Sequence, residues 1–431
     1  MERVMTDELQ SHVGRRARIA GWLHHQRKLG QVSFLLVRDR AGIAQVVMTE
    51  VSDREAASDL LPETVLEVVG DVVASEQAPS GVELQSVQVS IIAAPAIAPP
   101  FELRRDKIPA QLPTLLDHAA VALRHPQRRA IAAIAAASVH GFRACLDGLH
   151  FTEVHTPKVV AAATEGGANV FPIDWFGRTA YLAQSPQFYK QVMVGVFERV
   201  YEVAPVFRAE PHDTARHLAE YVSLDAEMGF IEDHTDVMAL LRDVIAAMLQ
   251  AVAERARSSV ELLGLELPAI PSQIPTIDFY AAQELIEADT QEQVLGQLDL
   301  APGHERWLCE WAKREHGSEF LYIVGYPLAK RPFYTHPNPK KAESSNGFDL
   351  LFRGLELVTG GQRLHRYGDY MDALAGTDLG PYEGYLEAFR HGMPPHGGFA
   401  IGLERWTARL TGAANVREVT LFPRDVNRVT P

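Results

Sequence analysis

The sequence has very little cysteine. Cys145 and Cys309 are the two cysteines among 431 residues, and they are far apart with no CxxC spacing. This number excludes a disulfide framework and a cysteine-based metal site, and it suits a reducing compartment. We therefore expect a cytoplasmic location.

An excess of positive charge and a long apolar run are also lacking. The chain has 41 Lys and Arg against 55 Asp and Glu, so its formal net charge is −14. A contact with nucleic acid must therefore be local rather than spread over the whole surface. The first residues are charged and have no apolar core, so we expect neither a signal peptide nor a membrane-bound protein.

The familiar phosphate-binding motifs are missing as well. The sequence has no GxxxxGK[ST] and no strand followed by GxGxxG and a helix, and His and Cys show no metal-ligand spacing. A nucleotide, if bound, must be held by side chains on a sheet.

Short alternating apolar runs fill residues 1–97, with glycines between them. Five short strands with a helix-like insert at 53–61 predict a small closed β-barrel of the OB type. Such barrels often bind single-stranded nucleic acid through loops and an aromatic platform. The predicted loop HHQRKLG, with Arg27, and then Phe34 and Gln45 are the candidates. A lone Phe34 is, however, also typical of a core residue.

Residues 98–125 are rich in proline and are predicted to form a linker. From residue 126 a long alanine-rich helix is expected, followed by a strand, FTEVHTPKVV, in which Pro157 is tolerated only at an edge, an end or an interface. Strands then outnumber helices without βαβ alternation, although the part from Thr276 to about Gly317 is mostly helical. We therefore predict an α+β domain at 126–431 with a mostly antiparallel sheet flanked by helices.

The residues Val200 to Phe230 are predicted to form a charged hairpin. Arg208 and Glu210 are expected to end its first strand on one face, and Asp225 lies on the return strand. The arginine suits phosphate oxygens, because a guanidinium stays charged and offers a planar set of donors. Scattered surface ion pairs on a solvated hairpin are the alternative.

Two later segments complete this pattern. GGFAIGLERWTARL is predicted to be a strand passing into a helix with Arg405 at the junction, and FDLLFRGLELVTGGQRLHRY is predicted to be a strand pair or a strand with a bulge at Gly360 and Gly361. Glu356 and Thr359 on this second segment offer oxygen ligands suited to magnesium, which usually arrives with its nucleotide.

These segments resemble a known family. FTEVHTPKVV, VYEVAPVFRAEPHDTARHLAEYVSLDAEM and GGFAIGLERWTARL resemble motifs 1, 2 and 3 of class II aminoacyl-tRNA synthetases, in the right order. QSPQFYKQ, SLDAEM, GGQRLHRY and LFPRD are similar to aspartyl-tRNA synthetases of the archaeal and eukaryotic type. The resemblance covers essentially the whole chain.

The resemblance implies a role for each candidate. For ATP it implies Arg208, Glu210, His217, Tyr221, Glu356 and Arg405, of which Arg208 and Arg405 are catalytic, and for Mg²⁺ it implies Glu356 and Thr359. For aspartate it implies Glu165, Gln187, Lys190, Asp225 and Arg363. For the anticodon it implies His24, Arg27, Phe34 and Gln45.

The resemblance also implies partners. ATP, L-aspartate and aspartate tRNA are expected, with a homodimer formed near Pro157. His24 stands where relatives strict for aspartate tRNA have Trp, so we hypothesise that asparagine tRNA is also charged, in which case a tRNA-dependent amidotransferase is a possible partner. The alternatives are an asparaginyl-tRNA synthetase, a non-catalytic tRNA-binding paralogue, and a paralogue that makes a free amide. Residues from about 283 to 317 give no chemical signal.

Overall fold

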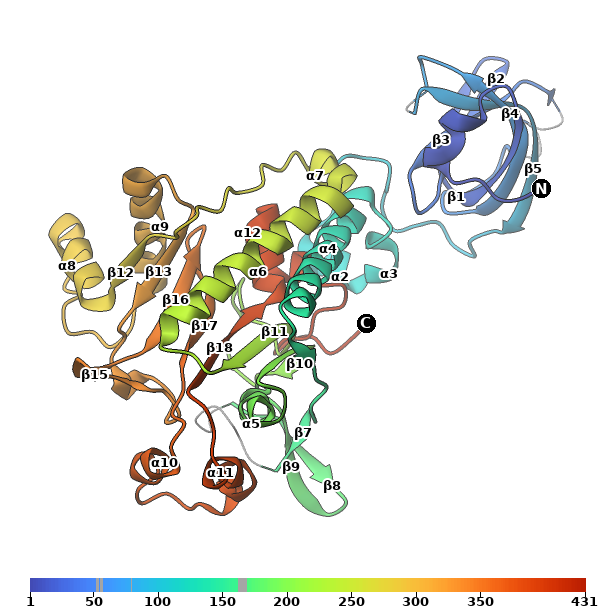
Figure 1. The fold of residues 1–431 in the computed structure, drawn as a ribbon. Helices are drawn as coiled ribbons and strands as arrows, with labels where there is room; N and C mark the ends of the chain where they lie inside the picture. Colours follow the sequence, from blue (N-terminus) through green and yellow to red (C-terminus); the bar gives the residue numbers. More distant parts are fainter. Residues whose placement is uncertain (52–53, 55–56, 79, 162–168) are drawn as a thin grey trace. The chain divides into compact units, whose positions relative to one another are not determined.

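The computed structural model describes residues 1–51, 54, 57–78, 80–161 and 169–431. The chain divides into two compact units, Met1–His125 and Pro126–Pro431 (Figure 1). The helix-like insert predicted at 53–61 lies partly outside the described residues. We describe each unit by itself.

The first unit contains a closed five-stranded barrel with the strand order β1-β2-β3-β5-β4, which confirms the predicted OB-type barrel. Every second side chain points inward, so alternating residues such as Ile19, Leu35 and Val46 are fully buried. The elements are η1 (Thr6–His12), β1 (Arg16–Leu29), β2 (Val32–Arg38), β3 (Ile43–Met48), β4 (Val65–Ala74) and β5 (Val82–Ala93).

The prediction of a loop at HHQRKLG is wrong. Residues 24–29 are the end of the long strand β1, and Leu29 pairs with Val32 across a two-residue turn that begins at Gly30. Such a tight turn needs a positive φ, which Gly30 adopts at 58° without steric cost. Arg27 therefore projects from a paired strand rather than from a loop.

The proline-rich residues 98–125 belong to the first unit. They form two short helices, α2 (Leu112–Asp117) and α3 (Ala119–Ala122), whose apolar side chains Leu115 and Ala122 pack with Phe101 and Leu103. Arg124 also donates a hydrogen bond of 2.9 Å to Glu63. This segment is thus packed rather than extended.

The second unit is organised around an eight-stranded sheet with the order β12-β13-β16-β17-β18-β11-β10-β6. The two outer pairs, β12–β13 and β10–β6, are parallel and the pairs between them are antiparallel, which confirms the prediction of a mostly antiparallel sheet. The strands are β6 (Thr152–Glu153), β10 (Arg199–Phe207), β11 (Glu220–Gly229), β12 (Thr276–Asp278), β13 (Phe320–Val324), β16 (Gly347–Phe352), β17 (Leu355–Gln362) and β18 (His396–Gly402).

Helices flank this sheet (Figure 1). Helices α4 (Pro126–Gly148) and α6 (His234–Arg255) run side by side over one face, and their residues Phe142 and Leu241 lie in the main core. The remaining helices are α5 (Gln187–Phe197), α7 (Arg257–Leu263), α8 (Phe279–Thr290), α9 (Pro302–His316), η2 (Leu328–Lys330), α10 (Tyr367–Ala373), η3 (Gly380–Tyr382), α11 (Glu383–Arg390), α12 (Leu403–Thr411) and η4 (Val416–Glu418).

By length and composition, α4 could cross a membrane. This is weak evidence, because the core helix of a water-soluble protein meets the same criterion. In this fold Ile134, Phe142 and Leu146 of α4 are fully buried within the protein.

Smaller sheets and one register shift differ from the sequence predictions. The segment 151–160 is two short strands, β6 and β7 (Val159–Val160), with Pro157 between them, because proline cannot donate to a strand ladder. Of the two alternatives for residues 347–362, the strand pair is confirmed, since β16 and β17 pair antiparallel, whereas the bulge at Gly360 and Gly361 is not present and the register instead shifts between Leu350 and Leu351. The other strands are β8 (Pro172–Trp175), β9 (Arg178–Leu182), β14 (Pro337–Asn338) and β15 (Lys341–Ser345).

Candidate functional site

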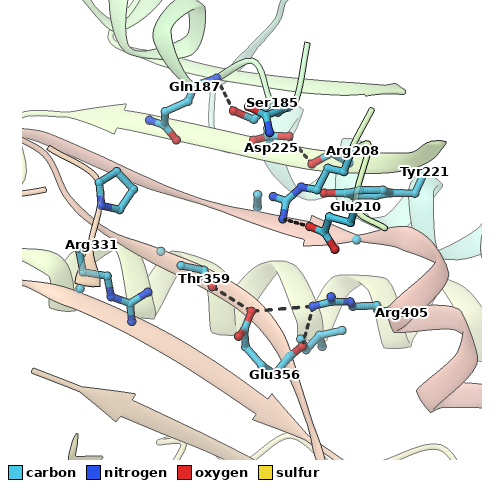
Figure 2. Close-up of a pocket in the computed structure, with 18 of the residues that line it drawn as sticks. Ser185, Gln187, Arg208, Glu210, Tyr221, Asp225, Arg331, Glu356, Thr359 and Arg405 are labelled. Carbon is cyan, nitrogen blue, oxygen red and sulfur yellow. Dashed lines mark hydrogen bonds and ion pairs between the residues drawn. The ribbon is translucent and has the colours of Figure 1, made fainter. Parts of the chain in front are cut away.

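A cavity of about 340 Å³ opens on the large sheet of the second unit. Its walls come from α5, the β10–β11 hairpin, β17 and the β18–α12 junction (Figure 2). The described candidates of this unit all line it: Gln187, Lys190, Arg208, Glu210, His217, Tyr221, Asp225, Glu356, Thr359, Arg363 and Arg405. Glu165 lies outside the described residues.

The hairpin forms the first wall. Strands β10 and β11 pair antiparallel, with Val206 opposite Tyr221. The expectation that Arg208 and Glu210 end β10 is wrong, because the strand stops at Phe207. The backbone N–H of Arg208 nevertheless donates to Ala219 at 2.9 Å, and its guanidinium carbon lies 5.8 Å from the centre of the Tyr221 ring. The flat ring and the fixed cation therefore lie together at the end of the hairpin.

The loop after β10 holds His217 close to Glu210. Nε2 of His217 lies 3.4 Å from a carboxylate oxygen of Glu210, and Nδ1 is 2.6 Å from the hydroxyl of Thr214. Burial lowers the pKa of His217, Glu210 opposes this effect, and the charges of Arg405 and Arg216 lower the pKa further. A neutral imidazole at neutral pH can accept or donate a hydrogen bond here.

Strand β17 and helix α12 form the opposite wall (Figure 2). The Thr359 hydroxyl donates to Glu356 Oε1 at 3.1 Å, and Nη1 of Arg405 lies 3.9 Å from the same oxygen. Arg405 also donates to the backbone oxygen of Glu356 at 3.4 Å. A carboxylate, a hydroxyl and a cation are thus held together at this end of the cavity.

The sequence reasoning missed Asp349, which lies beside this group. Asp349 pairs with Thr359 across β16 and β17 and is ion-paired with Arg331 at 3.1 Å. Burial raises the pKa of Asp349 to about 6, with Arg331 opposing and Glu356 adding to the rise. Carboxylates of Asp349 and Glu356 with the Thr359 hydroxyl are a hard-oxygen donor set that fits Mg²⁺. The signal in the sequence was an aspartate within the apolar strand FDLLF, next to the segment that carries the predicted ligands Glu356 and Thr359.

A buried charge cluster closes the cavity near α5. Lys190 donates to Asp225 at 3.0 Å and lies 3.2 Å from Glu227, and Arg363 donates to Glu227 at 2.9 Å. All four side chains are buried. Burial acts to raise the pKa of Glu227, but the charges of Arg363 and Lys190 outweigh it and keep the pKa below its usual value. The cluster therefore holds two cations and two anions in place before a ligand arrives.

Glu227 had no predicted role, although the sequence placed it on the same strand as Asp225. Its close neighbour Gly398 explains one of the glycines in GGFAIG. A Cβ added at Gly398 would lie 2.1 Å from the Ala226 oxygen and 2.1 Å from the Glu227 carboxylate. Strands β11 and β18 can thus approach each other here only with glycine.

Gln187 begins α5 at the rim of this cluster. Pro186 is the N-cap residue of this helix, and the Ser185 hydroxyl accepts the Gln187 N–H at 3.3 Å. The side-chain Nε2 of Gln187 is buried and makes no hydrogen bond to the residues that the structure describes. Its amide is therefore available to a ligand in the cavity.

A pH-dependent effect is expected from Glu404, whose carboxylate accepts the Val222 N–H. Burial raises the pKa of Glu404 to about 7 from 4.5. The folded protein then binds more protons than the unfolded chain between these values, so burial of the charge lowers stability as the pH rises through this range. Glutamine cannot ionise, so Glu404→Gln should avoid this loss. We predict that the free energy of unfolding of the variant, relative to that of the natural protein, rises by up to about 3 kcal/mol above pH 7 compared with its value below pH 4.5.

Chemical denaturation from pH 4.5 to 8 would measure this difference in the free energy of unfolding. Glu284, exposed on α8, provides the control as Glu284→Gln. A difference between Glu404→Gln and the natural protein that does not change with pH would contradict the prediction.

In the barrel, three of the four anticodon candidates lie together. Arg27 pairs with Phe34 across β1 and β2, its guanidinium carbon lies 5.8 Å from the centre of the ring, and it donates to Gln45 at 3.4 Å. Gln45 in turn donates to Glu83 at 2.8 Å. The half-buried ring and the exposed cation form one aromatic and charged patch on the barrel, and the amide of Gln45 is buried beneath it at 3% exposure.

His24 is not part of this patch. It is buried at 7% exposure, with Nδ1 3.1 Å from Arg38, and Arg38 forms a bidentate pair with Glu63. Burial lowers the pKa of His24 to about 4, and the charge of Arg38 adds to the effect. Any influence of His24 on a bound nucleic acid must therefore pass through neighbouring residues.

The fold and the cavity define a class of protein. An antiparallel sheet carries arginines, an aromatic ring and oxygen ligands from three separate segments, beside a buried pocket with two cations. Among the described residues there is no cluster of three or more His, Cys, Asp or Glu side chains preformed as a metal site. This arrangement is suited to a nucleotide that brings its own metal, next to a small charged substrate.

Comparisons with known proteins agree with this class. Residues 111–426 match the family of tRNA synthetases class II (D, K and N), and residues 17–92 match the OB-fold nucleic acid binding domain. The chain therefore belongs to the class II tRNA synthetases of the D, K and N group.

Individual relatives narrow the comparison. The chain is 47% identical to the aspartate–tRNA(Asp/Asn) ligase of Deinococcus radiodurans, over 100% of this chain and 99% of that protein. It is also 47% identical to the protein of the same name from Thermus thermophilus, with 100% of both chains covered. The crystal structure of asparaginyl-tRNA synthetase from Pyrococcus horikoshii with asparaginyl-adenylate is similar at a TM-score of 0.93 and 30% identity, with 100% of both chains covered.

Proposed function

We propose that this protein is an aspartate–tRNA ligase, which activates L-aspartate with ATP and transfers it to the terminal adenosine of tRNA. The observation that carries the proposal is the pair of buried cations in the pocket, Lys190 and Arg363. Both side chains only donate hydrogen bonds, and a carboxylate only accepts them. The NH₂ group of an asparagine side chain would face these donors without an acceptor, so the pocket favours aspartate. The names of the relatives from Deinococcus and Thermus support the same choice.

In the first step the aspartate α-carboxylate attacks the α-phosphorus of ATP, and pyrophosphate leaves. We propose that Arg208 binds the α-phosphate and the substrate carboxylate, that Arg405 binds the γ-phosphate, and that Tyr221 stacks on adenine, beside Glu210 and His217. Gln187, Asp225 and Glu165 are proposed to bind the substrate ammonium group. No side chain need act as a nucleophile, because catalysis consists of positioning and of neutralising the charge that develops.

We propose that Glu356 and Thr359, with Asp349 beside them, hold the magnesium ion that arrives with ATP. The bound ion would neutralise phosphate charge. In the second step a ribose hydroxyl of the tRNA terminal adenosine attacks the carbonyl carbon of the aspartyl adenylate, and AMP leaves.

We further propose that the barrel binds the anticodon through Phe34, Arg27 and Gln45, and that both aspartate and asparagine tRNAs are charged. The second point is supported by the Asp/Asn names of the two relatives and by His24 in place of Trp. Aspartate attached to asparagine tRNA needs amidation, so a tRNA-dependent amidotransferase would be a partner. A homodimer through the edge strand β6 and a cytoplasmic location complete the proposal.

The test of the amino acid is ATP–pyrophosphate exchange with aspartate or asparagine as the only amino acid. We expect exchange with aspartate and at least a hundredfold lower kcat/KM with asparagine, because a cationic donor that faces the amide NH₂ group instead of a carboxylate oxygen costs about 3 kcal/mol. Preference for asparagine would establish the rival asparaginyl-tRNA synthetase. Absence of exchange with either amino acid would favour a non-catalytic paralogue.

The tRNA proposal has its own test. Purified aspartate and asparagine tRNAs are charged in parallel, and we expect aspartate on both. Charging of aspartate tRNA alone would end the proposal that asparagine tRNA is a substrate.

Phe34→Ala is predicted to raise the KM for tRNA about tenfold to a hundredfold, because stacking of one base on an aromatic ring contributes about 1–3 kcal/mol. The rate of ATP–pyrophosphate exchange with aspartate should not change, since this reaction does not involve tRNA. Ile91→Ala, which removes an exposed apolar side chain from the same barrel, is the control. Equal effects of the two substitutions on charging would contradict a stacking role for Phe34.

A further inference from the structure

Helix α9 supplies a buried carboxylate behind the cavity, from a segment in which the sequence gave no chemical signal. Glu305 lies in the first turn of α9 and is 7% exposed. Its Oε2 accepts the backbone N–H of Glu356 at 3.1 Å and lies 3.7 Å from Nη1 of Arg216. Arg216 and Glu356 both line the cavity, on the β10–β11 loop and on β17. Glu305 therefore connects two of its walls.

The surroundings of Glu305 contain charges of both signs. Burial raises the pKa of Glu305, the Glu356 N–H opposes this, the Glu356 charge adds to the rise, and Arg216 and Arg405 oppose it. The first turn of a helix also favours a negative charge. Burying a carboxylate at this position costs desolvation free energy. The guanidinium of Arg216 and the backbone N–H of Glu356 offset this cost.

The position of Glu356 depends on contacts from two sides. The register of β16 and β17 shifts next to Glu356, between Leu350 and Leu351. At this irregular point the N–H of Glu356 donates to Glu305, and its backbone oxygen accepts from Arg405 at 3.4 Å. The strand segment that carries the Glu356 carboxylate is thus fixed from outside the sheet.

We infer that Glu305 is a positioning residue for ATP. It holds Arg216 of the β10–β11 loop at the phosphate end of the cavity and fixes the main chain of Glu356. Arg216 then offers a third guanidinium to the triphosphate, beside Arg208 and Arg405. The inference rests on the proposed function in one respect, that the cavity binds ATP.

The experiment measures binding of Mg-ATP to the full-length protein by calorimetry, which needs no amino acid. Glu305→Gln keeps an oxygen for the Glu356 N–H but removes the charge that pairs with Arg216. We expect the Kd for ATP to rise about tenfold, as for coupled charged neighbours in a binding site. Glu310→Gln, which changes an exposed acid on the same helix, should leave the Kd unchanged.

A double-mutant cycle separates positioning from general destabilisation. Arg216→Gln is expected to raise the Kd about tenfold, and Glu305→Gln should add little in that background because its effect passes through Arg216. In the exchange assay, the KM for ATP should rise in Glu305→Gln while the KM for aspartate stays within about twofold. If Glu305 only stabilised the fold, the KM for ATP and the KM for aspartate would change together.

Several results would overturn the inference. One is a Kd for Glu305→Gln within about twofold of that of the natural protein, and another is independent, multiplicative effects of the two substitutions. If Glu305→Gln does not fold, Arg216→Gln decides alone, because unchanged ATP binding would exclude the role of this arginine. Failure of the natural protein to bind ATP would instead refute the proposed function.

Discussion

Replacing Arg363 by leucine is expected to lower kcat/KM for aspartate activation about a thousandfold, equivalent to about 4 kcal/mol. In the proposed complex the guanidinium binds the side-chain carboxylate of aspartate, and leucine offers no donor. ATP–pyrophosphate exchange at varied aspartate concentrations measures the loss. Binding of ATP alone should change little, because Arg363 belongs to the charge cluster near α5 and not to the group around Arg405 and Glu356.

The control for this substitution addresses the charge that it leaves behind. Arg363 donates to Glu227 at 2.9 Å, and Glu227 has no exposed surface. Arg363→Leu therefore removes one of the two cations that contact this buried carboxylate among the described residues and leaves Lys190, which is destabilising by itself. The double substitution Arg363→Leu with Glu227→Gln removes both charges and should recover stability without recovering activity. If the double variant regained aspartate activation, Arg363 would not be a substrate ligand.

Replacing Arg208 by glutamine is expected to lower kcat for the same exchange about a hundredfold to a thousandfold. Arg208 lies at the end of the hairpin, beside the ring of Tyr221, where the α-phosphate is proposed to lie. Its guanidinium lies in the cavity wall, 3.8 Å from a carboxylate oxygen of Glu210, where its positive charge can neutralise the charge that develops as the adenylate forms. The loss for Arg208→Gln should persist at saturating aspartate. This would distinguish Arg208 from Arg363, whose replacement acts on the affinity for aspartate.

A matched arginine at the other end of β10 controls for changes in the strand. Arg199 starts β10 and donates to the Leu149 oxygen at 3.2 Å. Arg199→Gln removes the same charge outside the cavity and should leave kcat within about twofold of that of the natural enzyme. Comparable losses for the two variants would mean that Arg208 acts through the stability of the hairpin.

The sequence predicted the type of each domain because the signals are local. Strict alternation predicted the strands of the barrel, and the alanine-rich helical pattern predicted α4 at Pro126–Gly148. The position of strand ends was less certain. The end of β1 was interpreted as a loop because its residues are polar, although a two-residue turn at Gly30 lets the strand continue to Leu29.

The composition of the site was also accessible from the sequence, but its neighbours were not. The family resemblance identified eleven described residues that the fold places around one cavity. It gave no role to Asp349, Glu227 or Glu305, because the role of each depends on partners that are distant in the sequence. Arg363 and Glu227 are 136 residues apart and Arg216 and Glu305 are 89 apart, 305 minus 216, so only the folded chain brings them together.

The sequence by itself determined the family resemblance, the barrel and the antiparallel sheet, and which charged residues are candidates for ATP and aspartate. These properties follow from alternation, glycine positions and motif order, which are written within short stretches of chain. The tertiary structure decided which charges are paired and buried: Lys190 and Arg363 around Glu227, and Glu305 between Arg216 and Glu356. The physical reason is that desolvation and ion pairing depend on neighbours supplied by other strands and helices, and their strength cannot be assessed before those elements pack.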